Sequence, residues 1–252
     1  MAVLGIDIGG TGIKAAPVDT EKGILLAERY RVETPSPSTV AAVTPLIQEI
    51  LHHFEWHGEV GCGYPGVIKR GTIFTAANVD STWVGLDAST FFEQVTGCPT
   101  YMINDADAAG LAEMHFGAGV DQRGVVLVLT IGTGIGTALF VEGRLVPNLE
   151  LGHLQIRGKD AEHRASNRVR VDRELTWKKW ARRVNEYLMH VENLLWPDLI
   201  IIGGGVSKSF GKFAPHLVTR APIVCAKTYN DAGIIGAAMT SAHPESTGVV
   251  RG

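Results

Sequence analysis

The chain has 252 residues, of which 45% are hydrophobic and 19% charged, and its formal net charge is −3. This length can bury a core in one large or two modest domains, and the charge argues against a surface that attracts nucleic acid or membrane as a whole. Three scattered cysteines argue against a disulfide framework. The N-terminus lacks the basic start of a signal peptide, and no apolar run approaches the roughly 20 residues of a membrane span, so we expect a cytoplasmic protein.

The first elements of the chain are predicted to be antiparallel strands. Apolar runs predict strands at residues 3–8, 14–18 and 24–32, and a glycine turn at 9–12 separates the first two. A Rossmann or P-loop protein would enter a helix directly after its glycines. The opening therefore argues against both of those nucleotide-binding folds.

Helices and strands alternate in the next stretch. The hydrophobic spacing predicts helices at residues 40–54, 91–96 and 106–116, and strands at 60–64 and 100–103.

The opening pattern then returns. A strand at 125–131, a glycine turn at 132–136 and a strand at 137–141 repeat the order of residues 3–32, which indicates an internal duplication. An amphipathic helix at 175–195, a buried strand at 199–202 and a closely packed helix at 232–241 complete the prediction.

The duplication predicts two domains. We expect a small α/β domain at residues 1–108, completed by the C-terminal helix 232–242, and a large α/β domain at 109–231. Residues 243–252 are expected to form a flexible tail.

The first glycine turn has the composition of a phosphate site. Glycines at Gly9 and Gly10 let backbone N–H groups approach phosphate oxygens, Thr11 adds a hydroxyl and Lys14 adds a charge. Asp7, at the end of the strand, could hold Mg²⁺ directly or through water. The alternative is a plain hairpin turn with a surface lysine.

The second glycine turn offers the same chemistry. Its residues are Thr130, Gly132, Thr133 and Gly134. It could also be a plain hairpin, but two such turns after matching strands favour phosphate binding.

Two polar motifs could act on a hydroxylated substrate. Asp105, where a strand enters a helix, could accept a hydroxyl proton, and Asn104 could hold a neighbouring hydroxyl. The alternative is a helix N-cap. Glu150 and His153 could hydrogen-bond adjacent hydroxyls, or they could be an ordinary surface Glu and a histidine at the core edge.

In their fixed order, these motifs resemble those of the ROK sugar kinases. The motifs are DIGGTGIK, Asn78, NDADAAGLAE, LTIGTGIGTA, ELGH and IIIGGGVS, spread from residue 3 to about residue 242. The resemblance implies a two-domain α/β fold of the actin-like ATPase class (ribonuclease H-like, hexokinase-type) with an interdomain cleft. It also implies a homodimer.

The resemblance further implies that Asp105 is the base that deprotonates the 6-hydroxyl of glucose. The implied sugar ligands are Asn78, Asn104, Asp105, Glu150, His153 and Glu162. The two glycine turns become phosphate loops, and Gly203, Gly204 and Gly205 resemble a turn that borders a nucleotide base. Many family members carry a Cys-rich zinc loop after ELGH; no cysteine follows it here, so we expect Mg²⁺ but no zinc.

A basic segment suggests the phosphoryl donor. Residues 157–183 hold ten basic and four acidic residues, a charge of about +6. The helix KKWARRVNEYL and the following LLWPD and IIIGGGVSKSFGKF resemble the polyphosphate glucokinases. A polyanion without a base is held by Lys and Arg, and the expected groove includes Lys178, Lys179, Arg182 and Lys208. The alternative for the segment is a solvated helix face.

We therefore expect phosphoryl transfer to glucose from polyphosphate, with ATP as a further candidate donor. The alternatives are a strictly ATP-dependent ROK glucokinase or glucomannokinase, and a non-catalytic sugar sensor on a kinase scaffold. No nucleic-acid-binding module and no membrane anchor is expected.

Overall fold

A computed structural model describes residues 1–76 and 79–242 of the chain, which divides into two compact units. Unit 1 comprises Met1–Ala112 and Asp231–Gly252, and unit 2 comprises Glu113–Asn230. The chain therefore passes between the units twice, near residues 112 and 231. The predicted tail at 243–252 lies outside the described residues.

Unit 1 is built on a mixed sheet with strand order β3-β2-β1-β5-β8, and β4 also pairs with β2. Its strands are β1 (Ala2–Ile8), β2 (Ile13–Asp19), β3 (Ile24–Leu25), β4 (Tyr30–Val32), β5 (Val60–Tyr64) and β8 (Thr100–Asn104), with a small hairpin of β6 (Ile68–Lys69) and β7 (Thr72–Ile73). Its helices are α1 (Val40–His53), α2 (Ala88–Thr96), α3 (Asp105–Phe116), which crosses into unit 2, and α8 (Ala232–Ala242). β1 pairs antiparallel with β2, and β1, β5 and β8 run parallel.

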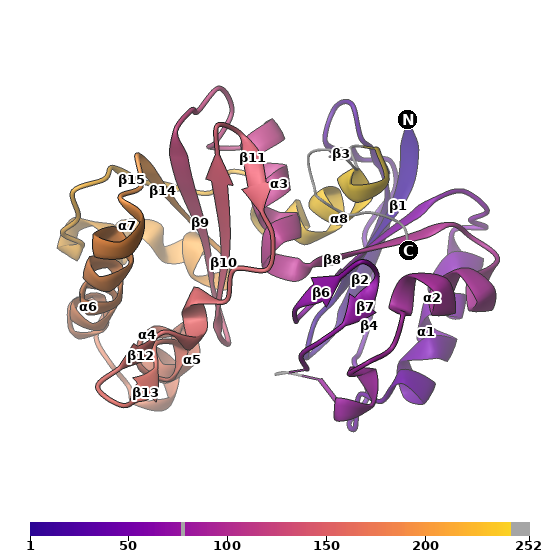
Figure 1. Ribbon diagram of the computed structural model, residues 1–252, viewed down its shortest axis with the longest axis horizontal. Coiled ribbons are helices and arrows are strands. Elements are labelled where there is room, and N and C mark those ends of the chain that lie inside the picture. The colour runs from indigo at the N-terminus through magenta and orange to yellow at the C-terminus, as the bar shows by residue number, and fades with distance from the viewer. Residues whose placement is uncertain (77–78, 243–252) are drawn as a thin grey trace. The chain divides into compact units, whose positions relative to one another are not determined.

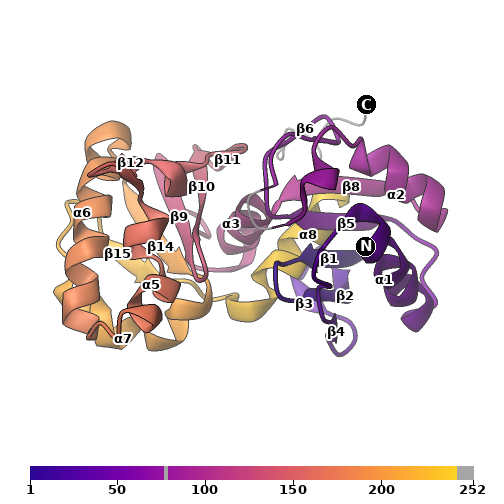
Figure 2. The same cartoon turned by 90° about the horizontal axis from the view of Figure 1, so that it is seen from below.

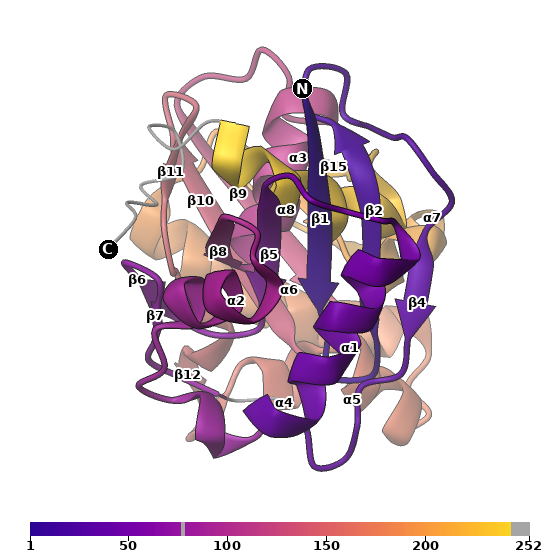
Figure 3. The same cartoon turned by 90° about the vertical axis from the view of Figure 1, so that its right-hand side faces the viewer.

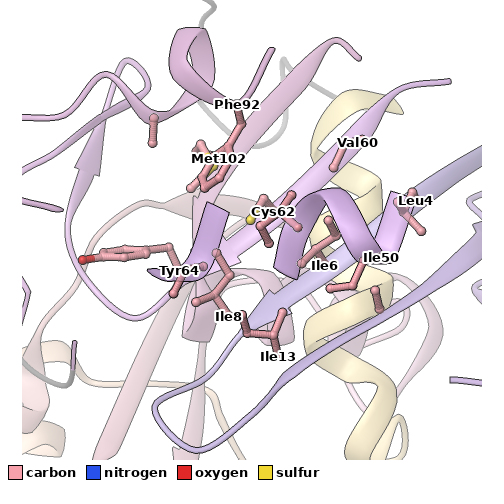
Figure 4. Packing of buried hydrophobic residues seen from close by; sticks show 14 of the residues in the cluster. Leu4, Ile6, Ile8, Ile13, Ile50, Val60, Cys62, Tyr64, Phe92 and Met102 are labelled. Atoms are coloured by element: carbon pink, nitrogen blue, oxygen red, sulfur yellow. The ribbon is translucent and has the colours of Figure 1, made fainter. Parts of the chain in front are cut away.

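Helices cover both faces of this sheet. Figure 3 shows α1 and α2 in front of it and α8 behind it. Alternate residues of a strand point to one face, so Leu4, Ile6 and Ile8 lie together and pack with Ile50 of α1 (Figure 4). Each is fully buried, which stabilises the fold by about 1.5–3 kcal/mol per side chain.

The C-terminal helix packs against the sheet at glycine positions. A Cβ on Gly61 of β5 would collide with the backbone of Ala237, and one on Gly236 would collide with the backbone of Ala108 in α3. Helix α8 therefore approaches both neighbours more closely than any larger residue allows.

Unit 2 repeats the plan with strand order β11-β10-β9-β14-β15. The strands are β9 (Val125–Ile131), β10 (Ile135–Val141), β11 (Arg144–Val146), β14 (Leu199–Gly203) and β15 (Ile223–Cys225) (Figure 1). The remaining elements are a hairpin of β12 (Gln155–Ile156) and β13 (Lys159–Asp160), and helices α4 (Glu162–Ala165), α5 (Asn167–Asp172), α6 (Trp177–Leu195) and α7 (Phe210–Phe213). As in unit 1, the first two long strands are antiparallel and the next is parallel to the first.

Helix α6 covers one face of this second sheet (Figure 2). Trp180, Tyr187 and Val191 are fully buried on its inner side with Leu129 and Ile202 of the sheet. The outer side carries the lysines and arginines of the basic segment, which gives the amphipathic pattern that the sequence predicted.

Most predicted elements are confirmed, and one is wrong. The strand predicted at 24–32 is two short strands, β3 and β4, that pair with different parts of β2. Three other elements begin two or three residues away from the predicted position: α2 at Ala88, α6 at Trp177 and β10 at Ile135.

None of the helices in residues 1–76 and 79–242 combines the length and apolarity needed to cross a bilayer.

Candidate active site

The first glycine turn, residues 9–12, joins β1 to β2. The Gly9 amide donates to the Gly12 carbonyl at 3.1 Å, which closes the turn. The Gly9 carbonyl accepts from the Thr34 hydroxyl at 2.5 Å, and the Thr11 carbonyl accepts from Arg31 Nη2 at 3.1 Å. The segment around β4 therefore occupies two carbonyls of this turn, which the sequence did not reveal.

Asp7 and Lys14 stand beside this turn as a cross-strand pair. Lys14 Nζ lies 3.3 Å from Asp7 Oδ2, and the two side chains are 33% and 16% exposed. On its other side the Asp7 carboxyl meets the first turn of α8, where a Cβ on Gly233 would come within 3.0 Å of it. The Asp7 carboxyl therefore lies between the Lys14 ammonium group and the N-terminal turn of α8, and a helix N-terminus favours a negative charge.

Asp105 lies at the same edge of the sheet as Asp7. In the parallel strands Asp7 is opposite Gly63 and Gly63 is opposite Ile103, two residues before Asp105. A Cβ on Gly63 would be 3.8 Å from the Asp105 Cα. Because neighbouring strands are about 4.8 Å apart, the backbones at Asp7 and Asp105 are separated by about 10 Å. The carboxyl ends of the parallel strands β1 and β8 therefore bring Asp7 and Asp105 to the same edge of the sheet.

Asn104 is the N-cap of α3. Its Oδ1 accepts from the amides of Ala106 at 2.9 Å and Asp107 at 3.0 Å, and its Nδ2 donates to the Gly66 carbonyl at 3.2 Å. The side chain is buried, so the capping alternative holds for Asn104, and its role as a sugar ligand stays a prediction. The cap fixes the start of α3 and thereby the position of Asp105.

The second glycine turn, residues 132–134, has an acidic neighbour. Gly132 N donates to the Gly134 carbonyl at 3.0 Å, and the Ile135 amide donates to Glu162 Oε2 at 3.2 Å. A Cβ on Gly134 would strike that carboxylate oxygen. The absence of a side chain at Gly134 therefore makes room for Glu162, and an incoming phosphate would meet a negative charge there.

Glu150, His153 and Glu162 are grouped in unit 2, as the resemblance implied for sugar ligands. His153 Nε2 lies 3.7 Å from Glu150 Oε2, and the charge of Glu162 acts on both groups. Burial raises the pKa of Glu150 above its usual value. Carboxylates and an imidazole at these separations can accept and donate hydrogen bonds to adjacent hydroxyls.

Asp160 is a member of this group that the sequence did not single out. Its Oδ2 accepts from His153 Nδ1 at 2.9 Å, and Gln155 Nε2 donates to its Oδ1. This hydrogen bond raises the pKa of His153 and lowers that of Asp160. The small β12–β13 hairpin carries both Gln155 and Asp160, so it sets the orientation of the His153 ring and leaves Nε2 for a ligand.

The basic segment is only partly neutralised. Arg157 and Arg164 both bind Glu186, at 2.5 and 2.8 Å, and Arg170 stacks on Trp177. In contrast, no carboxylate of the described chain pairs with an exposed set of three cations on the first turns of α6, namely Lys178, Lys179 and Arg182. These three are among the predicted groove residues, which also include Lys208.

The glycine turn after β14 also presents a cation. β14 ends at Gly203, Gly204 has a φ of 73°, and a 3₁₀ turn at Gly205–Ser209 carries the exposed Lys208. A Cβ on Gly204 would come 2.7 Å from the Ile131 amide, so this turn packs against the start of the second glycine turn. Asn78, the remaining predicted ligand, lies outside the described residues.

The acidic side chains could hold Mg²⁺ only together with water and the phosphates of a substrate. Nowhere in the described ranges do three or more His, Cys, Asp or Glu side chains gather so as to hold a metal. Mg²⁺ does not need such a cage, because one carboxylate, several waters and substrate phosphates complete its octahedron. Asp7, beside the first turn and partly exposed, is the residue that fits this role.

Comparison with known proteins gives consistent matches. Residues 3–166 match the ROK family. A polyphosphate glucokinase of Mycobacterium tuberculosis (strain CDC 1551 / Oshkosh) is 47% identical over 238 residues, which cover 94% of this chain and 90% of that protein.

Solved structures agree with this match. The inorganic polyphosphate/ATP-glucomannokinase of Arthrobacter sp. strain KM is 45% identical, with a TM-score of 0.93 over 97% of this chain and 99% of that one. A ROK family glucokinase from Streptomyces griseus, solved in complex with glucose and AMPPNP, is 25% identical, with a TM-score of 0.79 over 94% of this chain and 98% of that one. The predicted two-domain actin-like ATPase fold is thereby confirmed, and this chain belongs to the ROK family.

Proposed function

We propose that this chain is a polyphosphate glucokinase, which transfers a phosphoryl group from inorganic polyphosphate to the 6-hydroxyl of glucose. The observation that carries the proposal is the sheet edge of unit 1, where Asp105 and the glycine turn beside Asp7 and Lys14 lie together. The strong similarity to polyphosphate glucokinases over 94% of the chain supports the same donor and acceptor.

Asp105 acts as the general base. Its carboxylate accepts the proton of the sugar hydroxyl as that oxygen forms a bond to phosphorus, and the bond from phosphorus to the remaining polyphosphate breaks. The cap at Asn104 keeps this carboxylate at the first position of α3. Without a base, the hydroxyl is a weak nucleophile.

The first glycine turn receives the transferring group. Lys14 and backbone N–H groups of the turn stabilise the charge on its oxygens. Bound Mg²⁺, held by Asp7, would neutralise phosphate charge.

Unit 2 supplies groups for the sugar hydroxyls and for the polyphosphate chain. Glu150, His153 and Glu162 provide hydrogen-bond partners of the kind that several adjacent hydroxyls require. Lys178 and Lys179 pair with no carboxylate among the described residues, and exposed cations of this kind suit a long polyanion, which offers charge but no base to recognise.

The test is glucose 6-phosphate formation by the purified full chain with Mg²⁺ and either long-chain polyphosphate or ATP. We expect turnover with polyphosphate, and mannose in place of glucose measures the range of acceptors. Turnover with ATP alone would instead indicate an ATP-dependent ROK glucokinase. Glucose binding without turnover from either donor would indicate a sugar sensor.

A further inference from the structure

A row of three charged residues crosses the first sheet next to the glycine turn. Asp7 of β1 is directly opposite Lys14 of β2, and Lys14 is directly opposite Arg31 of β4. Directly opposed residues in antiparallel strands project from the same face. The row therefore presents one negative and two positive charges side by side at the end of the hairpin.

The Arg31 guanidinium lies on the turn itself. Its Nη2 donates to the Thr11 carbonyl at 3.1 Å. A Cβ on Gly12 would be 2.8 Å from both Nε and Nη2, so the missing side chain at Gly12 is what lets the guanidinium approach. The Thr11 carbonyl uses one of its five N–H donors, and the other four have no acceptor in the described part of the chain.

Arg31 is the uncompensated charge of the row. Lys14 is paired with Asp7 at 3.3 Å, whereas Arg31 is exposed and pairs with no carboxylate in the part of the chain that the structure describes. A guanidinium binds phosphate oxygens in a bidentate way, which a lysine cannot do.

The amides of the turn are also available. The carbonyls of Gly9, Thr11 and Gly12 are all hydrogen-bonded, but the amides of Gly10, Thr11 and Gly12 have no acceptor among residues 1–76 and 79–242. Amides without an acceptor beside a guanidinium with spare donors can form an anion site, because both kinds of group donate N–H bonds to anionic oxygens.

We propose that Arg31 is a binding residue for the phosphate chain of the donor, holding it against the first glycine turn. This inference rests on the proposed function, in which that turn receives the transferring phosphoryl group. It assigns donor binding in unit 1 to an arginine from β4 in addition to Lys14.

The decisive measurement is calorimetric binding of tripolyphosphate to the full chain without glucose. R31A and R31Q should weaken binding by about tenfold, because a charge-assisted contact is lost. R31K keeps the charge but loses the bidentate geometry, so it should weaken binding less than R31Q does. R31Q keeps an N–H donor for the Thr11 carbonyl but not the charge, so a normal affinity for R31Q would show that Arg31 only shapes the turn and would overturn the inference.

Two controls complete the experiment. K22A removes an exposed cation at the far end of the same hairpin and should bind tripolyphosphate as wild type does. In R31Q, the slope of log Kd against log salt concentration should also be smaller. The decrease should correspond to the loss of about one phosphate contact. An unchanged salt slope would count against a direct contact.

A parallel kinase assay separates this inference from the proposed function. R31Q should raise KM for polyphosphate about tenfold and leave KM for glucose unchanged. If wild type forms glucose 6-phosphate and R31Q binds tripolyphosphate normally, the inference alone fails. If wild type forms none from either donor, the proposed function fails, while weaker tripolyphosphate binding by R31Q still supports the anion site.

Discussion

The two glycine turns share a sequence pattern but have opposite electrostatic surroundings. The turn at residues 9–12 has Lys14 and Arg31 beside it, whereas the turn at residues 132–134 has the Glu162 carboxylate on its following amide. We expect the first environment, where Lys14 and Arg31 outnumber Asp7, to favour a phosphate, and the second to favour a hydroxyl or a cation. A duplicated motif has therefore kept its backbone and changed its neighbours, so the glycines alone do not reveal which ligand each turn binds.

The largest effect is expected at Asp105, on the side of the first turn. Asp105→Asn removes the proton acceptor without changing its size, so kcat with polyphosphate should fall by about a thousandfold or more. The measurement is steady-state glucose 6-phosphate formation. Asp121→Asn is the control and should leave kcat unchanged, because Asp121 lies in an exposed turn with a φ of 62° that Asn also tolerates. More than about a tenth of wild-type activity in Asp105→Asn would reject the base.

Removing the negative charge beside the second turn tests the contrast between the two turns directly. Glu162→Gln keeps an acceptor for the Ile135 amide but removes the charge, so KM for glucose should rise about tenfold while KM for polyphosphate stays unchanged or falls. The ratio of the two KM changes is the readout. A larger rise for polyphosphate than for glucose would assign the second turn to the donor.

A smaller effect is expected on α6, where the cations belong to unit 2. The double variant Lys178→Ala/Lys179→Ala should weaken long-chain polyphosphate several-fold more than ATP, because only a long chain can reach additional cations. Competing donor kinetics at two salt concentrations measure this. Lys22→Ala/Lys69→Ala removes two exposed cations from unit 1 and serves as the charge-matched control. Equal losses for both donors would argue against a dedicated groove.

The smallest effect concerns the orientation of His153. Asp160→Asn removes the carboxylate that raises the pKa of His153, so this pKa should fall. In wild type, the His153–Asp160 pair stabilises the folded protein below the ordinary histidine pKa of about 6.5. This contribution is lost as the pH rises through the raised pKa of His153, and Asp160→Asn lacks it. NMR titration of the imidazole measures the shift, with Asp172→Asn as control. An unchanged pKa of His153 in this variant would show that Asp160 does not act on the imidazole.

The sequence predicted what periodicity and turn chemistry determine locally. The long strands, the helices α1 and α6 and the repeated hairpin follow from apolar spacing, and the α8 glycines indicated close packing. It did not predict the break between β3 and β4 or the β12–β13 hairpin, because strands of two or three residues have too few positions to show a period. Arg31 and Asp160 were missed for the same reason, since each acts through the register of a short strand.

The packing of α8 on the first sheet also affects how unit 1 folds during synthesis. This helix covers one face of a sheet whose first strand, β1, is synthesised about 230 residues earlier. At typical translation rates of 5–20 residues per second, about 10–50 s separate the two on the ribosome. Throughout that interval the sheet face that α8 covers lacks this helix, so we expect nascent unit 1 to be prone to aggregation. A chain that stopped before residue 231 would leave that surface open permanently.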